Sequence, residues 1–212
     1  MVSNGYAMIG QVRFRELKTR IGLAAFIAGT AWLVSPGVWP AVWFAAVLLT
    51  QFLDWLLFRP VRLNPDMAMS RLYRTALCAI ASLNVIVYSG IAAYLWITGG
   101  ETGRVFAMVQ VAGGLLHVSL HMHQARSLLL AAVIPHSLYF LGMPVLGAVI
   151  DGRPQDLLIS LGGLLYMTHL IVAVRQSSMT TRAMQDANTL ARLERRKACL
   201  LYTSPSPRDV EE

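Results

Sequence analysis

The chain has 212 residues, of which 56% are hydrophobic and only 14% are charged, and its mean hydropathy is +0.54. A soluble domain usually carries about a quarter charged residues, so these values exclude an ordinary soluble protein and indicate an integral membrane protein. The formal net charge of +7 does not indicate nucleic-acid binding, because the basic residues lie between apolar segments and form no continuous stripe with interleaved aromatic residues.

Long apolar runs predict six transmembrane helices, since a helix needs about 20 mostly apolar residues to span a bilayer. The predicted spans are residues 21–34, 38–58, 75–97, 105–122, 128–150 and 157–174. The first is short and could gain a turn from the preceding residues. The fifth contains Pro135 and Pro144, and we expect a kinked rather than a broken helix, because neighbouring helices can cover the freed carbonyl groups. The expected fold is therefore an all-α integral membrane protein.

The distribution of basic residues predicts the orientation of these spans. Fifteen of the 18 lysines and arginines fall on one predicted side, only Arg104 and Arg153 fall on the other, and Arg208 lies near the C-terminus. The positive-inside rule then places both termini in the cytoplasm. Residues 1–20 become a basic cytoplasmic N-terminus and residues 21–174 a six-helix membrane module. A cleaved signal peptide is disfavoured, because no A-x-A-like site follows the first span.

After the sixth span the chain is polar, lacks glycine and proline, and is rich in helix-forming residues over residues 175–198. A stripe with alternating spacings of three and four runs through this segment, and five of its eight positions are apolar. The stripe is Val172, Gln176, Met179, Ala183, Asp186, Leu190, Leu193 and Lys197. Such a pattern favours a coiled coil with a second copy of the chain. The segment is either a signalling helix that continues the last span or a solvated amphipathic tail.

A loop-poor six-span module followed by a charged helix, here ARLERRKA at residues 191–198, resembles the N-terminal sensor region of bacterial sensor histidine kinases, often hybrid ones. The resemblance implies a multi-pass protein of the bacterial inner membrane that is homodimeric through residues 175–198. In that family the helix leads to a hairpin with a phosphoacceptor motif S-H-E-x-R-T-P and then to an ATP-binding domain, which together act on a response regulator. None of these motifs occurs in the chain, which therefore has no catalytic domain of its own.

The last segment, residues 199–212, has a different character. The eleven residues CLLYTSPSPRD, from Cys199 to Asp209, match in order the translation of a transposase-type sequencing adaptor and its adjoining primer site. The alternative is a natural linker rich in proline and serine. We interpret the segment as non-native and exclude it from fold reasoning. On this interpretation the chain is a fragment that stops before its kinase domain.

Ionisable groups inside spans are candidate functional residues, because hydrocarbon penalises them. Four histidines lie in the inner halves of predicted spans: His117, His121, His136 and His169. All four are candidate metal ligands, and the first two are four residues apart, so they share a helix face and could both reach one metal ion or haem edge. The alternatives for the four are a proton-sensing role and structural hydrogen bonding between helices.

Three further polar residues lie within predicted spans: Gln51, Asp54 and Asn84. We expect Asp54, five residues before Arg59, either to snorkel to the inner interface or to pair with a neighbouring arginine, or else to form a buried polar pair with Gln51 one turn earlier. Asn84 is expected to form a hydrogen bond between helices.

The predicted function is the sensor module of a two-component histidine kinase, which passes a membrane or small-ligand signal through the sixth span. One alternative is the sensor module of a cyclic-dinucleotide synthase. Another is a self-contained transporter or integral membrane enzyme, for which inverted repeats with midplane breaks are expected. Pro135 and Pro144 have no counterparts in the first three spans, which disfavours the transporter. The motifs GxGxxG, HExxH and GxSxG, and the P-loop, are also absent from the sequence.

Overall fold

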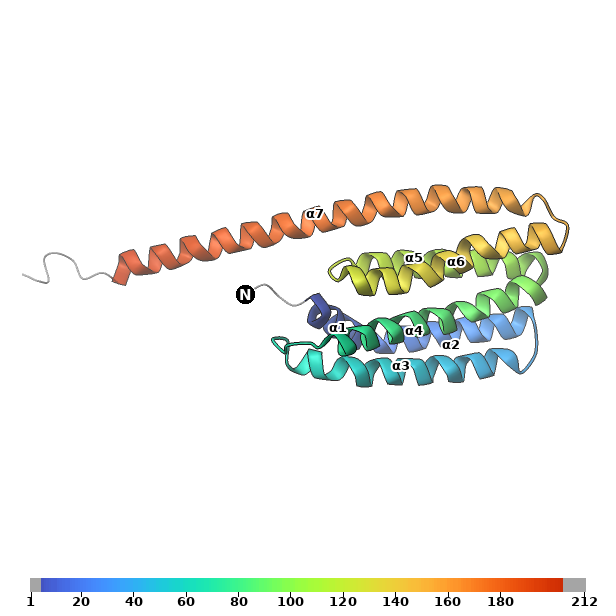
Figure 1. Cartoon of the computed structure of the whole chain (residues 1–212), viewed down its shortest axis with the longest axis horizontal. Coiled ribbons are helices and arrows are strands. Elements are labelled where there is room, and N and C mark those ends of the chain that lie inside the picture. The colour runs from blue at the N-terminus through green and yellow to red at the C-terminus, as the bar shows by residue number, and fades with distance from the viewer. Residues whose placement is uncertain (1–4, 204–212) are drawn as a thin grey trace, which may run out of the picture. The chain divides into compact units, whose positions relative to one another are not determined.

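The structure, a computed structural model, describes residues 5–203, with side chains as far as Cys199. The regular secondary structure of this part of the chain consists of helices alone (Figure 1). The helices are α1 (Gly5–Arg15), α2 (Leu17–Val34), α3 (Trp39–Leu63), α4 (Arg71–Thr98), α5 (Gly100–Met122), α6 (Arg126–Ile150) and α7 (Asp156–Thr203). Most of the segment interpreted as non-native, from residue 204 onward, lies outside the described residues.

Helices α2 to α7 are each long and apolar enough to cross a membrane, as expected of a multi-pass α-helical membrane protein. Every one of the six predicted spans coincides with one of these helices. The helices extend beyond the predicted apolar runs because charged residues continue them, as Arg59 and Arg62 do at the end of α3. Helix α6 contains Pro135 and Pro144 and is not broken at either, as expected. The short helix α1 was not predicted.

Local sequence fixes where several helices begin and end. The Ser70 hydroxyl oxygen accepts a hydrogen bond from the backbone N–H of Tyr73, which caps the start of α4. Helices α4 and α5 are joined by a very short turn in which Gly100 has a φ of +58°. A Cβ atom on Gly99 would lie 2.8 Å from the carbonyl oxygen of Leu95. Only glycine fits this approach, so the two helices can reverse direction almost without a loop.

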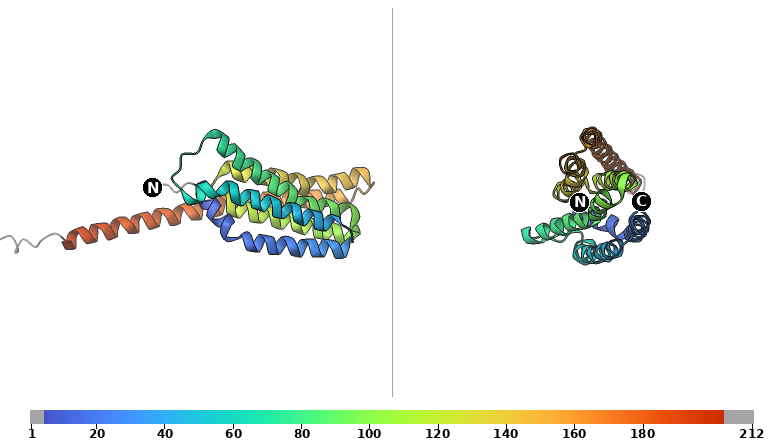
Figure 2. Two further views of the ribbon diagram at one scale, coloured as in Figure 1. Left: turned by 90° about the horizontal axis from the view of Figure 1, so that it is seen from below. Right: turned by 90° about the vertical axis from the view of Figure 1, so that its right-hand side faces the viewer.

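Within residues 1–171, which form one compact unit, α4 occupies the centre and packs against α2, α3, α5 and α6. Helices α2 to α6 run in alternating directions, so the connections between them gather at two ends of the unit (Figures 1 and 2). One end, here called the basic end, holds α1 and the loops at residues 64–70 and 123–125. The opposite end holds the loops at residues 35–38 and 151–155 and the turn at Gly99.

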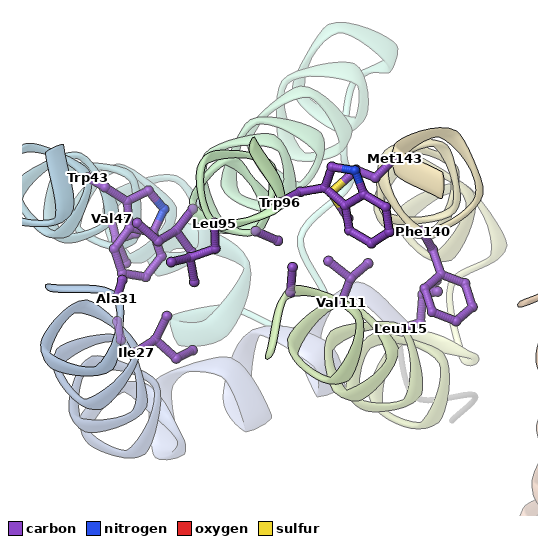
Figure 3. Close-up of a cluster of buried hydrophobic side chains, with 14 of the residues drawn as sticks. Ile27, Ala31, Trp43, Val47, Leu95, Trp96, Val111, Leu115, Phe140 and Met143 are labelled. Carbon is purple, nitrogen blue, oxygen red and sulfur yellow. The ribbon is translucent and has the colours of Figure 1, made fainter. Parts of the chain in front are cut away.

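Two clusters of buried apolar side chains form the core, one toward each end. The cluster toward the opposite end contains Trp43, Leu95, Trp96, Val111 and Phe140 (Figure 3). The cluster toward the basic end includes residues of α1 as well as α3, α4, α5 and α6. Side chains of α1 therefore form part of the core of the unit, although α1 itself is too short to cross a bilayer.

Many large apolar side chains point outward from the helices. Phe26, Leu138 and Leu161 are each more than 60% exposed, and they belong to α2, α6 and α7. Large contiguous apolar surface is unfavourable in water, whereas it is the expected exterior of helices surrounded by lipid. These side chains give independent support to membrane embedding.

From Val172 onward the chain forms a second unit, which is helical through Thr203 as the continuation of α7. Its apolar side chains are isolated on one polar helix, and five large ones among the described residues are about half exposed or more: Val172, Met179, Met184, Leu190 and Leu193. All of these except Met184 belong to the stripe noted in the sequence.

Candidate functional site

A cavity of about 730 Å³ lies between helices α1 to α5, with a contribution from α6. Its apolar edge includes Leu23, Phe26 and Val109, each half exposed or more, so the cavity opens between α2 and α5. Its polar lining comprises Arg13, Glu16, Thr19, Arg20, Gln51, Asn84, Tyr88, Gln110, His117, His121 and His136. The size is that of a small-molecule site, and a polar lining of this extent is unusual inside a membrane bundle.

A buried ion pair joins α1 to α3 beside the cavity. The Arg13 guanidinium donates from Nε to Asp54 Oδ2 at 2.8 Å and from Nη2 to Asp54 Oδ1 at 2.7 Å. Both side chains are nearly inaccessible, and Arg13 also lies over the ring of Phe58. Burying two charges is costly, and the two-pronged geometry offsets much of that cost. Asp54 is therefore paired with an arginine and does not snorkel, but the partner is Arg13 of α1 and not an arginine close to it in the sequence such as Arg59.

A chain of hydrogen bonds continues from α2 through α3 to α4. Arg20 Nη1 donates to Gln51 Oε1 at 3.2 Å, and Gln51 Nε2 donates to Asn84 Oδ1 at 3.3 Å. The expected interhelical hydrogen bond of Asn84 is confirmed, and its partner is Gln51. Of the three polar residues identified in spans, Gln51 and Asn84 line the cavity and share a hydrogen-bond network, and Asp54 holds Arg13, which also lines the cavity.

His117 and His121 meet Glu16 at the basic end of the cavity. The two imidazole rings lie 4.3 Å apart, centroid to centroid. Glu16 Oε1 lies 3.3 Å from His121 Nε2, and Glu16 Oε2 lies 3.7 Å from His117 Nε2. One ligand atom from each of the three residues lies within 4.8 Å of the others. Within residues 5–203 this is the one group of three or more His, Cys, Asp or Glu residues with metal-binding spacing.

The other two candidate histidines have separate surroundings. His136 lines the same cavity, and its Nδ1 forms a 2.8 Å hydrogen bond with the hydroxyl of Ser89 on α4. His169 lies on α7, and its Nδ1 donates to the carbonyl oxygen of Leu165 at 2.8 Å. His169 does not line the cavity. The four histidines considered from the sequence therefore do not form a single cluster.

Several buried polar atoms around the cavity have no hydrogen-bond partner within the described part of the chain. They are Glu16 Oε2, Arg20 Nε, Asn84 Nδ2 and Gln110 Oε1. Such atoms are costly when left unsatisfied, and their convergence on one cavity indicates that it accommodates polar occupants.

Three residues of the site were not singled out from the sequence: Arg13, Glu16 and Arg20. They stand in a basic N-terminal stretch that positive-inside counting explains fully, so nothing in their spacing distinguishes them. Arg13 lies on α1, Arg20 lies on α2 and Glu16 lies between these helices, and the contacts of α1 and α2 with α3 and α5 bring the three residues to the cavity.

Comparison with protein-family models, curated proteins and solved structures finds no significant match for this chain.

Proposed function

We propose that the chain is the membrane sensor module of a bacterial signalling protein, with the kinase of a two-component system as its output and a cyclic-dinucleotide synthase as the alternative output. The polar cavity near the basic end receives the signal, and α7 carries it out of the membrane. Both termini lie in the cytoplasm and the module resides in the inner membrane. The parent kinase uses ATP and acts on a response regulator.

The observation that carries the proposal is the continuity of α7. Its first part has the apolar composition of a membrane span, its second part is polar, and the helix is unbroken from Asp156 to Thr203. A continuous helix can transmit a rotation or a shift from a span to a distant domain. A solvated tail has no need of such continuity.

The cavity supports the sensor reading because the loops at the opposite end are short. The connections at residues 35–38, 99 and 151–155 leave no room for a separate binding domain. A ligand must then bind within the bundle, and the cavity of about 730 Å³ has the volume and the polar groups for it.

The exposed apolar stripe on the second unit fits a second copy of the chain. Met179, Leu190 and Leu193 lie on that stripe and are about half exposed or more. Heptad spacing is self-complementary in a parallel pair of helices. The module thus works as a homodimer through residues 175–198.

The test is a chimaera in which residues 1–198 replace the sensor of a characterised histidine kinase. One to seven residues are inserted at the junction, which covers one heptad. If α7 transmits a helical signal, kinase output rises and falls with insertion length, with a period of about 3.5 residues. Output that stays constant across the series would refute transmission and favour the transporter or membrane-enzyme alternative. Western blotting of membranes verifies equal insertion of each chimaera.

A further inference from the structure

Glu16, His117 and His121 have the geometry of a metal centre, and we infer that these three residues bind a divalent transition-metal ion of the zinc type. The statement that the ion is the sensed signal rests on the proposed function, whereas the site itself does not.

The backbone contact of His121 fixes the tautomer of its neutral ring. Its Nδ1 lies 2.8 Å from the carbonyl oxygen of His117, and a carbonyl oxygen only accepts, so Nδ1 carries the hydrogen. The Nε2 of the neutral ring then presents a lone pair. That lone pair faces Glu16 Oε1 at 3.3 Å, and a carboxylate oxygen is also an acceptor. Two acceptors at this distance require a cation between them.

A proton bound in place of a metal ion would leave part of this cluster without a partner. Protonation of His121 gives Glu16 Oε1 a donor, but Glu16 Oε2 is buried without a hydrogen-bond partner among the described residues and lies 3.7 Å from His117 Nε2. Protonating both rings would place two cations in rings 4.3 Å apart, which is unfavourable. One metal ion would instead be shared by both rings and the carboxylate.

The distances are close to those of tetrahedral coordination. Zinc binds histidine nitrogen and carboxylate oxygen at about 2.0–2.1 Å, which separates two ligands of a tetrahedron by about 3.3 Å. Glu16 Oε1 lies 3.3 Å from His121 Nε2, Glu16 Oε2 lies 3.7 Å from His117 Nε2, and one ligand atom from each of the three residues lies within 4.8 Å of the others. Side-chain rotations that draw these three ligand atoms together would bring each of them to bonding distance from one ion.

Outer-shell contacts and access also fit a metal site. His121 donates its Nδ1–H to a backbone carbonyl oxygen. A hydrogen bond of this kind usually orients a histidine that binds a metal ion. The His117 and His121 side chains remain 44% and 39% exposed, and both line the cavity, so an ion can reach them. Three protein ligands leave a fourth position open to the cavity, as in zinc sites that bind exogenous ligands.

The charged groups near the three ligand residues are compatible with the binding of a cation. Arg13 is neutralised by Asp54 through two hydrogen bonds. Among the described residues Arg20 forms no comparable two-pronged ion pair and donates to the uncharged amide of Gln51. An anionic fourth ligand beside Arg20 would offset the remaining positive charge.

The experiment titrates the purified full chain in detergent with Co²⁺, which replaces zinc and absorbs visible light strongly when four-coordinate. We expect one equivalent to bind, Zn²⁺ to displace it, and elemental analysis after desalting to find one metal ion per chain. Glu16→Gln and His121→Ala should each weaken binding more than about 100-fold, the upper end of what loss of an outer-shell partner costs. His169→Gln is the matched control, because His169 has the same backbone hydrogen bond and lies outside the cluster.

A ligand substitution distinguishes coordination from folding. Glu16→Cys should retain binding and add a thiolate-to-Co²⁺ charge-transfer band, which appears only if residue 16 contacts the ion. The inference is overturned if the wild type binds no stoichiometric Co²⁺ or Zn²⁺, or if Glu16→Gln and His121→Ala bind as the wild type does. In the chimaera, Zn²⁺ should change kinase output for the wild type and not for Glu16→Gln. Output that follows insertion length but ignores Zn²⁺ would leave the sensor proposal standing and remove the metal as its signal.

Discussion

At the scale of single residues, the wall of the cavity depends on a close contact between α5 and α6. A Cβ atom on Gly114 would lie 2.8 Å from His136 Cε1 and 2.9 Å from His136 Nε2. The Nδ1 of the same imidazole forms a hydrogen bond with the hydroxyl of Ser89. Glycine at position 114 therefore lets the His136 ring approach α5 closely and complete the cavity. A Cβ atom on the neighbouring Gly113 would meet no atom within 4 Å.

We predict that Gly114→Ala lowers the free energy of unfolding by about 1–3 kcal/mol, the usual cost of overpacking, because the added methyl group displaces His136 from Ser89. Gly113→Ala is the matched control and should be neutral or slightly stabilising, since alanine favours a helix over glycine. Thermal unfolding of both variants in the same detergent measures the difference. Equal midpoints for the two variants would contradict the contact.

The partners of polar residues are harder to predict than the residues themselves. Gln51, Asp54 and Asn84 stand out in the sequence because each is polar within an apolar run. Glu16 does not stand out, because it lies in a charged stretch where acids and bases are ordinary. Its proximity to His121 depends on tertiary packing of α1 and α2 beside α5, and no local pattern encodes that contact.

At the scale of elements, hydropathy predicts the helices that cross the membrane and misses the one that does not. The six spans have long apolar runs, and lipid imposes that composition regardless of tertiary structure. Helix α1 has only 11 residues, including two glycines, so neither length nor helix propensity marks it. It is held by tertiary contacts such as the Arg13–Asp54 pair, which a sequence pattern cannot reveal.

For α7 we predict that cysteine at position 190 cross-links two chains, whereas cysteine at position 192 does not. Leu190 lies on the apolar stripe and Arg192 lies beside it, although both are exposed in the single chain. In a parallel coiled coil the stripe positions face their own copies across the seam. Copper-phenanthroline oxidation in membranes, with Cys78 and Cys199 replaced, followed by non-reducing electrophoresis measures the dimer fraction. Equally efficient cross-linking of Leu190→Cys and Arg192→Cys would argue against a dimer through this face.

At the scale of the whole molecule, the arrangement of charges within residues 5–171 follows the antiparallel order of the helices. Arginines of α1, α3, α4 and α6 gather at the basic end, next to the Glu16 cluster. At the opposite end, Arg104 lies 2.9 Å from Asp151 and 3.3 Å from Asp156, and Arg153 pairs with Glu101 at 2.8 Å. The basic residues of that end are thus matched by acids, whereas those of the basic end exceed their acidic partners. The positive-inside rule counts lysines and arginines, and their excess at the basic end disfavours translocation of that end across the membrane.

The orientation of the bundle determines which compartment supplies the ion to the Glu16 cluster, and cysteine labelling can measure it. In a chain lacking Cys78 and Cys199, we predict that Gln155→Cys reacts with a membrane-impermeant maleimide in intact cells. Asp66→Cys should react only after the cells are permeabilised. Both positions are exposed loop residues at opposite ends of the bundle, so each serves as the accessibility control for the other. The reason is the charge imbalance between the two ends, because translocating the arginines flanking residues 64–70 is disfavoured. The reverse labelling pattern would place the metal cluster at the outer face, where extracytoplasmic zinc would be its source.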